Sequence, residues 1–112
     1  MSTVTSSGTQ AAVIGTEHTL GAAVNTAGTY LLVVDLINLV DGDTVELRLK
    51  RSALGAGTVR VLYAQVYSDV PPADNLMQAS VPVPIPTNGG LTATLKQTNG
   101  TGRSFPWALE AL

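Results

Sequence analysis

The sequence has no cysteine, little charge and few aromatic residues. Without cysteine the chain can form no disulfide framework, no thiolate nucleophile and no cysteine-ligated zinc site. Charged residues make up 12% of the chain, about half of the usual share in soluble domains. A surface this poor in charge suggests that neighbouring subunits cover part of it, although a low-charge β protein would have the same composition. Hydrophobic residues reach 45% while aromatic residues stay at 4%, so the core must be aliphatic, which suits β-sheets.

The remaining absences limit the partners and the cellular location. The formal net charge is −2, and the six lysines and arginines form no cluster, so we expect no nucleic-acid partner. Residues 1–15 contain neither a basic segment nor an apolar run of the length that a signal peptide or a membrane span needs. We therefore expect a soluble protein that is made in the cytoplasm and has no membrane partner.

The stretch from Thr44 to Ser68 is the clearest structural signal in the chain. Within residues 45–50 three aliphatic side chains alternate with three charged ones, which is typical of a half-buried strand. A turn follows, in which Gly55 and Gly57 can adopt positive φ without a Cβ clash. Residues 58–68 are apolar on both faces and predict a central strand. Together these features predict a β-hairpin on which the remaining strands pack.

The other β-compatible runs extend this hairpin into one domain. We expect a broken edge strand at residues 11–24, an inner strand at 29–36, a proline-interrupted edge strand at 76–83, and strands at 91–98 and 103–112. Residues 11–112 are therefore predicted to form a single all-β domain, a jelly-roll-like β-sandwich of about seven strands without helices. The patterns do not specify the strand order.

Several segments outside these strands also carry expectations. Residues 1–10 are rich in Ser, Thr and Gly, which predicts a flexible N-terminal arm that orders only against a partner, or else a frayed terminus. Residues 37–43 and 69–75 are expected to be loops. Asn99–Gly102 predicts the turn of a second hairpin, between the last two strands. Trp107 alternates with buried-type residues on the last strand, Phe105 and Leu109, and is expected in the core.

No constellation of residues predicts catalysis. His18 is the single histidine, and its neighbour Glu17 would point to the opposite face of a strand, so the two could not cooperate in proton transfer. No serine has His18 nearby in sequence, so no nucleophile and base pair is indicated. We predict a protein that is not an enzyme and that has no catalytic, cofactor-binding or metal-binding residues.

The acidic and glycine-rich turns resemble ligand sites only superficially. Asp41–Asp43, with Asp35 upstream, could begin a calcium loop, but the spacing of further oxygen ligands is absent and a turn explains these residues better. The glycine pairs at 55 and 57 and at 100 and 102 precede no helix, so they predict no phosphate cradle. The glycosylation pattern at residues 99–101 has no meaning without a secretory signal.

Two tyrosines and an arginine on the second strand of the hairpin leave a binding function open. Tyr63 and Tyr67, with Arg60, could form a platform for a carbohydrate or a peptide. Ordinary core packing and cross-strand pairing would explain these residues equally well.

The segment LKQTNGTGRSFPW, residues 95–107, together with the runs TVELRLKR and VRVLYAQVYS, resembles small β proteins among the virion structural proteins of tailed bacteriophages. The resemblance covers most of the chain from Glu17 onward and contains no catalytic signature. It implies a capsid decoration or cement protein on the capsid surface of the virion, with the major capsid protein and copies of itself as partners. A tail-associated or host-carbohydrate-binding module is the alternative, and a small enzyme is the weakest interpretation.

We predict that the isolated protein is catalytically silent, because no nucleophile is paired with a base. Broad hydrolase assays on the purified protein should give no turnover. Turnover that disappears in His18→Ala would contradict this prediction.

Overall fold

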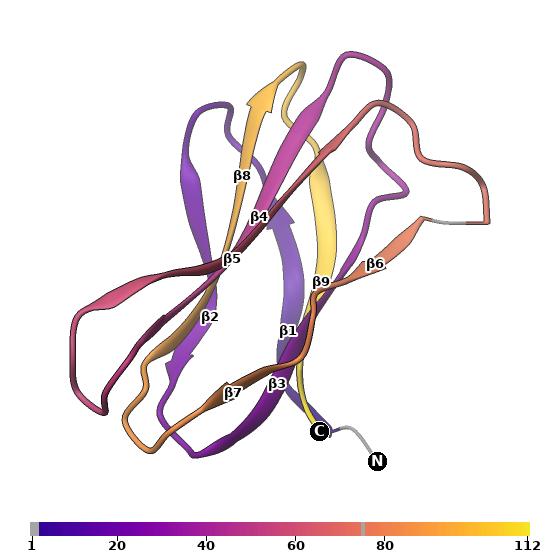
Figure 1. The fold of residues 1–112 in the computed structure, drawn as a ribbon. Coiled ribbons are helices and arrows are strands. Elements are labelled where there is room, and N and C mark those ends of the chain that lie inside the picture. Colours follow the sequence, from indigo (N-terminus) through magenta and orange to yellow (C-terminus); the bar gives the residue numbers. More distant parts are fainter. Residues whose placement is uncertain (1–2, 75) are drawn as a thin grey trace.

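The computed structural model describes residues 3–74 and 76–112, and these residues form nine β-strands and no helix (Figure 1). The strands are β1 (Thr3–Ala11), β2 (Glu17–Val24), β3 (Gly28–Asp35), β4 (Thr44–Ser52), β5 (Val59–Ser68), β6 (Met77–Ala79), β7 (Val83–Ile85), β8 (Leu91–Asn99) and β9 (Ser104–Ala111). One sheet has the order β1-β9-β3-β6, with β7 also paired to β3. The other has the order β2-β8-β4-β5. The prediction of an all-β protein is confirmed.

The chain folds back on itself about the β4–β5 hairpin. Outward from this hairpin, β3 pairs with β6 and β7, β2 pairs with β8, and β1 pairs with β9, all antiparallel. Two further antiparallel pairs, β3 with β9 and β4 with β8, complete the two sheets. The predicted hairpin is therefore confirmed as the centre of the pairing pattern, and every other pair joins segments that are distant in sequence.

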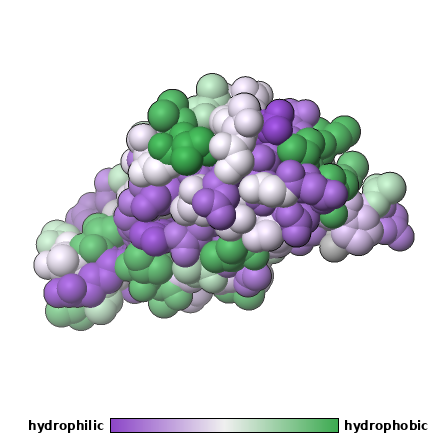
Figure 2. Space-filling view, turned by 90° about the horizontal axis from the view of Figure 1, so that it is seen from above, coloured by the Kyte–Doolittle hydropathy of each residue, from purple (hydrophilic) through white to green (hydrophobic). Residues whose placement is uncertain are grey.

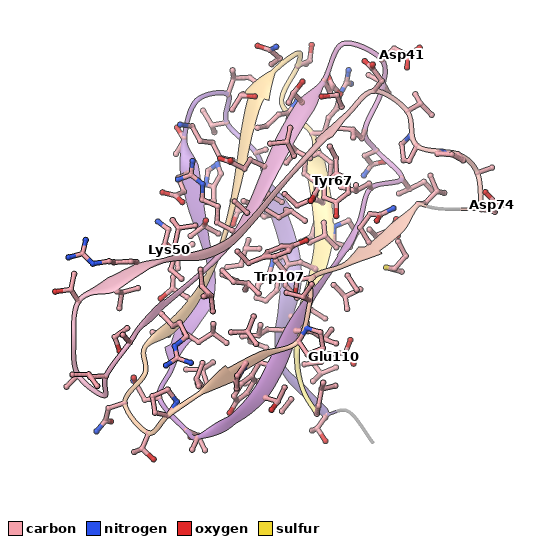
Figure 3. The ribbon with its side chains drawn as sticks, in the orientation of Figure 1. Asp41, Lys50, Tyr67, Asp74, Trp107 and Glu110 are labelled. Atoms are coloured by element: carbon pink, nitrogen blue, oxygen red, sulfur yellow. The ribbon has the colours of Figure 1, made fainter. Side chains whose placement is uncertain are left out.

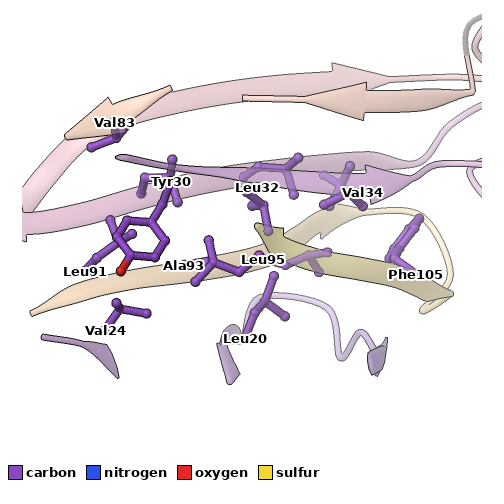
Figure 4. Packing of buried hydrophobic residues seen from close by; sticks show 14 of the residues in the cluster. Leu20, Val24, Tyr30, Leu32, Val34, Val83, Leu91, Ala93, Leu95 and Phe105 are labelled. Atoms are coloured by element: carbon purple, nitrogen blue, oxygen red, sulfur yellow. The ribbon is translucent and has the colours of Figure 1, made fainter. Parts of the chain in front are cut away.

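The two sheets share one hydrophobic core, which is almost entirely aliphatic (Figure 4). Residues of β2, β3, β4, β7, β8 and β9 supply it, including Leu32 and Val34 on β3. Phe105 and Leu109 are fully buried there, as predicted. Trp107 lies on the same strand face but is only half-buried, and it packs against the margin of the core. Its ring lies close to glycine backbone on β1 and β2, at Gly8 and Gly21.

The prediction that residues 58–68 form a central strand is wrong. β5 is the edge of its sheet and pairs only with β4 among the described strands. A break in the ladder between Leu49 and Lys50 leaves Leu62 without a direct partner, so Val61 and Tyr63 do not share one face as simple alternation would require. The far end of the hairpin projects from the body of the molecule (Figure 1). Apolar residues on both faces of β5 are therefore exposed.

The prediction of a flexible arm is wrong for Thr3 to Gln10; residues 1 and 2 lie outside the described residues. These residues form most of β1, which is paired with β9 along its length, from Thr3 opposite Ala111 to Ala11 opposite Ser104. The polar composition does leave most of the side chains exposed. The strand nevertheless forms because the edge of β9 supplies backbone hydrogen bonds, a gain that composition does not reveal.

The turn at Asn99–Gly102 does not form the predicted second hairpin. It carries the chain from one sheet to the other, because β8 pairs with β2 and β4 whereas β9 pairs with β1 and β3. The Thr101 N–H donates to Asp43 Oδ1 at 3.2 Å, so contacts with another loop hold this turn in place of a cross-strand ladder. Gly100 has φ of 89°, and a Cβ added there would overlap with the Asp43 side chain.

The other expected elements agree with the structure in outline. β2 is an edge strand, β3 is an inner strand, and residues 37–43 form a loop. The proline-rich segment lies at a sheet edge but forms two short strands, and with β1 this accounts for nine strands in place of about seven. In the turn of the central hairpin the positive φ belongs to Ala56, at 61°, and not to either glycine.

We predict that Gly100→Ala destabilises the protein more than Gly42→Ala. Both glycines have φ near 90°, so each substitution carries the strain of a side chain at positive φ, about 1–2 kcal/mol. Only at Gly100 does the new methyl group collide with Asp43, and overpacking adds about 1–3 kcal/mol. At Gly42 nothing lies within 4 Å of the added Cβ. Urea unfolding of both variants measures the difference, and equal effects would contradict the prediction.

Candidate interaction surface

Glu17 and His18 do not form a catalytic pair. His18 is half-buried on the edge strand β2, where its Nε2 accepts a hydrogen bond of 3.0 Å from the backbone N–H of Val13. Glu17 is on the other face of β2, where it accepts a hydrogen bond of 2.7 Å from Thr94 Oγ1 and lies 2.9 Å from Lys50 Nζ. Each side chain is therefore engaged in a contact that joins β2 to the rest of the fold.

Charges of both signs alternate on the outer face of the sheet β2-β8-β4-β5. Arg48 of β4 lies 2.6 Å from Glu46 and 3.6 Å from Glu17. The hydrogen bonds from Thr94 and Lys50 outweigh desolvation and, with the nearby positive charges, hold the pKa of Glu17 below its ordinary value of 4.5. Because these pairs are partly exposed, they contribute little to stability. The mixture of signs leaves no single-sign patch on this face.

Asp43 is a buried carboxylate whose contacts are all within the fold. Its side chain is almost fully buried and accepts hydrogen bonds from Val40 N–H at 3.1 Å, Thr101 N–H at 3.2 Å and Arg103 Nε at 2.9 Å. Burial alone would raise the pKa of Asp43, but these hydrogen bonds and the charge of Arg103 outweigh it, so the pKa lies below its ordinary value of 3.8. Sequence reasoning treated this residue only as part of a turn.

Asp41 and Asp35, for which the sequence favours turns over a calcium loop, also bind backbone. Asp41 Oδ1 accepts a hydrogen bond from Val70 N–H at 3.1 Å, and Asp35 Oδ1 accepts one from Ile37 N–H at 3.0 Å. Asp69 faces the same turn and accepts from Gly42 N–H at 2.8 Å. Across residues 3–74 and 76–112, no group of three or more acidic or histidine side chains is arranged to hold a metal ion. The contacts favour the interpretation as turns.

Tyr63 and Tyr67 do not present an open platform with Arg60. Both tyrosines are half-buried and pack against the core. Burial, with the charge and the hydrogen bond of Tyr63, raises the pKa of Tyr67 to about 12. Arg60 lies beyond the ladder break, opposite Arg51. The two rings and the guanidinium therefore have different surroundings.

The most distinctive surface is an exposed apolar region on β5, which we call the β5 surface. It consists of Val59, Val61, Leu62 and Val66, which are 42%, 49%, 56% and 50% exposed. Leu54, in the turn of the same hairpin, is 77% exposed. Figure 2 shows apolar side chains at the left end of the molecule, where the hairpin projects. Sequence reasoning missed this surface because two apolar faces predict burial.

A shallow concavity adjoins the β5 surface. Its volume is about 420 Å³, and it spans the ends of β4 and β5 nearest the hairpin turn. Arg51 and Arg60 line it together with Val61 and Leu62. A second hollow of about 230 Å³ lies over β3, β6 and β9 and contains one carboxylate, that of Asp35. The first hollow therefore combines positive charge with an uncovered apolar strand.

Comparisons with known proteins do not assign this surface. No family model matches the chain. No curated protein and no solved structure matches it. The part of the chain that the structure describes has no helix that is long and apolar enough to cross a membrane.

We predict that Asp43→Asn lowers the free energy of unfolding at neutral pH by about 1.5–3 kcal/mol, the usual contribution of hydrogen bonds to a charged group. Because folding lowers the pKa of Asp43, its carboxylate stabilises the native state above pH 3.8, and this stability is lost as the pH falls below that value. The stability of Asp43→Asn should therefore depend less on pH between neutrality and strong acid. Urea unfolding at several pH values measures this dependence.

The control is Asp41→Asn, which removes an exposed carboxylate with one backbone hydrogen bond. Its effect at neutral pH should be smaller than that of Asp43→Asn. An unchanged acid dependence in Asp43→Asn would show that the buried carboxylate is not the group that titrates.

Proposed function

We propose that this chain is a non-enzymatic virion structural protein of the capsid decoration or cement type. In this role it bridges and stabilises subunits of the major capsid protein, together with copies of itself, on the outer surface of the capsid. The observation that carries the proposal is the β5 surface, because an apolar strand at the free edge of a sheet favours association with other protein chains.

The other sheet edges support a specific role for β5, since each has features that oppose pairing with another chain. β6 and β7 are three residues long, and β7 contains Pro84. β2 has an irregular ladder between Leu20 and Val24, with Gly21 at a φ of 74°. β1 has a ladder break near Ser6 and mostly polar side chains. β5 also has an irregular ladder, at Leu62, but it has ten residues, no proline and exposed apolar side chains.

The strand pairing supports the narrower proposal that the fold is a jelly roll. If β6 and β7 are one interrupted strand, the nested pairs divide into two four-stranded sheets, β1-β9-β3-β6 and β2-β8-β4-β5, as in a double-sheet jelly roll. Jelly rolls recur in viral capsid and lectin domains. Because one fold hosts many functions, this likeness supports the proposal only together with the β5 surface.

The contacts of the polar residues support a structural role. His18, Glu17 and Asp43, which would be the first residues to consider for acid–base chemistry, are each hydrogen-bonded to the fold itself. We propose the virion capsid as the assembly because residues 95–107 resemble virion proteins. Its glycine-rich turn joins the two sheets of this fold and does not form a hairpin.

We predict that virions of the virus that encodes this chain contain it at copy numbers near those of the major capsid protein. Quantitative mass spectrometry of purified particles measures the ratio. Particles that lack the protein should regain stability to heat when it is added back. A few copies per particle, with binding on a glycan array, would favour the alternative of a tail-associated carbohydrate-binding module. Complete absence from the virion would refute both.

A further inference from the structure

β5 lies at the edge of its sheet, and its ladder with β4 is irregular only at Leu62. It has ten residues, one charged side chain (Arg60) and no proline. An edge strand of this kind presents backbone N–H and C=O groups that only another strand can pair regularly. The binding partner of this edge should therefore be a strand whose side chains match an apolar and nearly uncharged strand.

We propose that this binding partner is β5 of a second copy, paired antiparallel about a twofold axis, so that two four-stranded sheets join into one. This inference rests on the proposed assembly function and names the partner at the same surface. A twofold contact uses the same residues on both chains, so an apolar strand is its own complement. Leu62 of each copy would then lie beside Val66 of the other copy.

The charges at the two ends of β5 determine the direction of pairing. Arg60 lies at the start of the strand, opposite Arg51 and next to the concavity. Asp69 follows the other end of the strand and is exposed, and Asp41 is close to it through its hydrogen bond to Val70. Figure 3 shows Asp41 at the upper end of the molecule, away from Lys50 on β4. Antiparallel pairing brings the basic end of one copy to the acidic end of the other, whereas parallel pairing would bring like charges together.

This complementarity also predicts the register. If Ala64 lies on the twofold axis and faces Ala64 of the second copy, the irregularity at Leu62 takes up one residue, and Val59 of one copy lies opposite Ser68 of the other, beside Asp69. Residues directly opposite in an antiparallel pair have Cα atoms about 4.5–5.5 Å apart, which is within the range that a disulfide requires. Val59, at the strand start, would lie roughly 26 Å from Val59 of the second copy, at about 3.3 Å per residue over about eight residue spacings.

Because the chain contains no cysteine, single cysteine substitutions test this register directly. Ala64→Cys should give a covalent dimer on mild oxidation in the absence of any capsid, and Val59→Cys should not. Cross-linking at both positions would indicate parallel pairing and would overturn the proposal. Cross-linking at neither position, in a protein that sedimentation velocity shows to be monomeric at all concentrations, would also overturn it.

A charge substitution provides the second measurement. Val66 lies opposite Glu46 within its own sheet, so Val66→Lys should leave the fold intact. In the dimer this ammonium group would be placed against Leu62 of the second copy, and the dissociation constant should rise by about tenfold or more. The matched control is Val13→Lys, at a position that is 60% exposed and outside the strands. An unchanged dissociation constant in Val66→Lys would contradict pairing through β5.

The two proposals fail separately in these experiments. A protein that is abundant in virions but monomeric in solution, with no cross-link at Ala64, would overturn the self-pairing and retain the decoration function. A dimer linked at Ala64 in a protein absent from virions would retain the self-pairing and remove the decoration function.

Discussion

The buried carboxylate of Asp43 is the contact on which the arrangement of the two sheets depends most directly. Asp43 lies between β3 and β4, at a point where the chain passes from one sheet to the other. Its side chain accepts hydrogen bonds from Thr101 and Arg103, in the passage from β8 to β9. Its carbonyl accepts one of 3.0 Å from Asp69 N–H, where β5 ends and the chain turns toward β6. Three connections between the sheets therefore meet at one residue, and the passage from β8 to β9 cannot move without breaking a contact to a buried charge.

The side chain of Gln97 forms hydrogen bonds to the last turn at the same end of the sandwich. Its side chain is fully buried, donates to the carbonyls of Asn99 and Thr101 and accepts a hydrogen bond from Arg103 N–H. The polar groups of the last turn are thus satisfied without a hairpin ladder. At the other end of the sandwich, the loop before β8 holds the turn of the β4–β5 hairpin, where Ala56 N–H donates to Asn88 O at 2.8 Å and Ser52 N–H donates to Gly89 O at 2.9 Å.

The polar surfaces of the fold and the β5 surface differ in how far their groups are satisfied. The charged outer face of the β2-β8-β4-β5 sheet satisfies its own ion pairs, and the aspartates of the loops bind backbone. The β5 surface is different, because its apolar side chains and its open ladder are not satisfied within the chain. An apolar strand edge of this kind favours association with another protein chain.

The sequence by itself determined the all-β class, the aliphatic core and the central hairpin, since alternation of side chains and turn residues are local signals. The burial of Leu32, Val34, Phe105 and Leu109 could be predicted in the same way. Only the tertiary structure decided that β1 pairs with β9, that residues 99–102 cross between sheets, and that β5 is an edge. Each of these depends on which distant strand supplies backbone partners, and the apolar pattern of β5 is the same whether its cover comes from its own chain or from another.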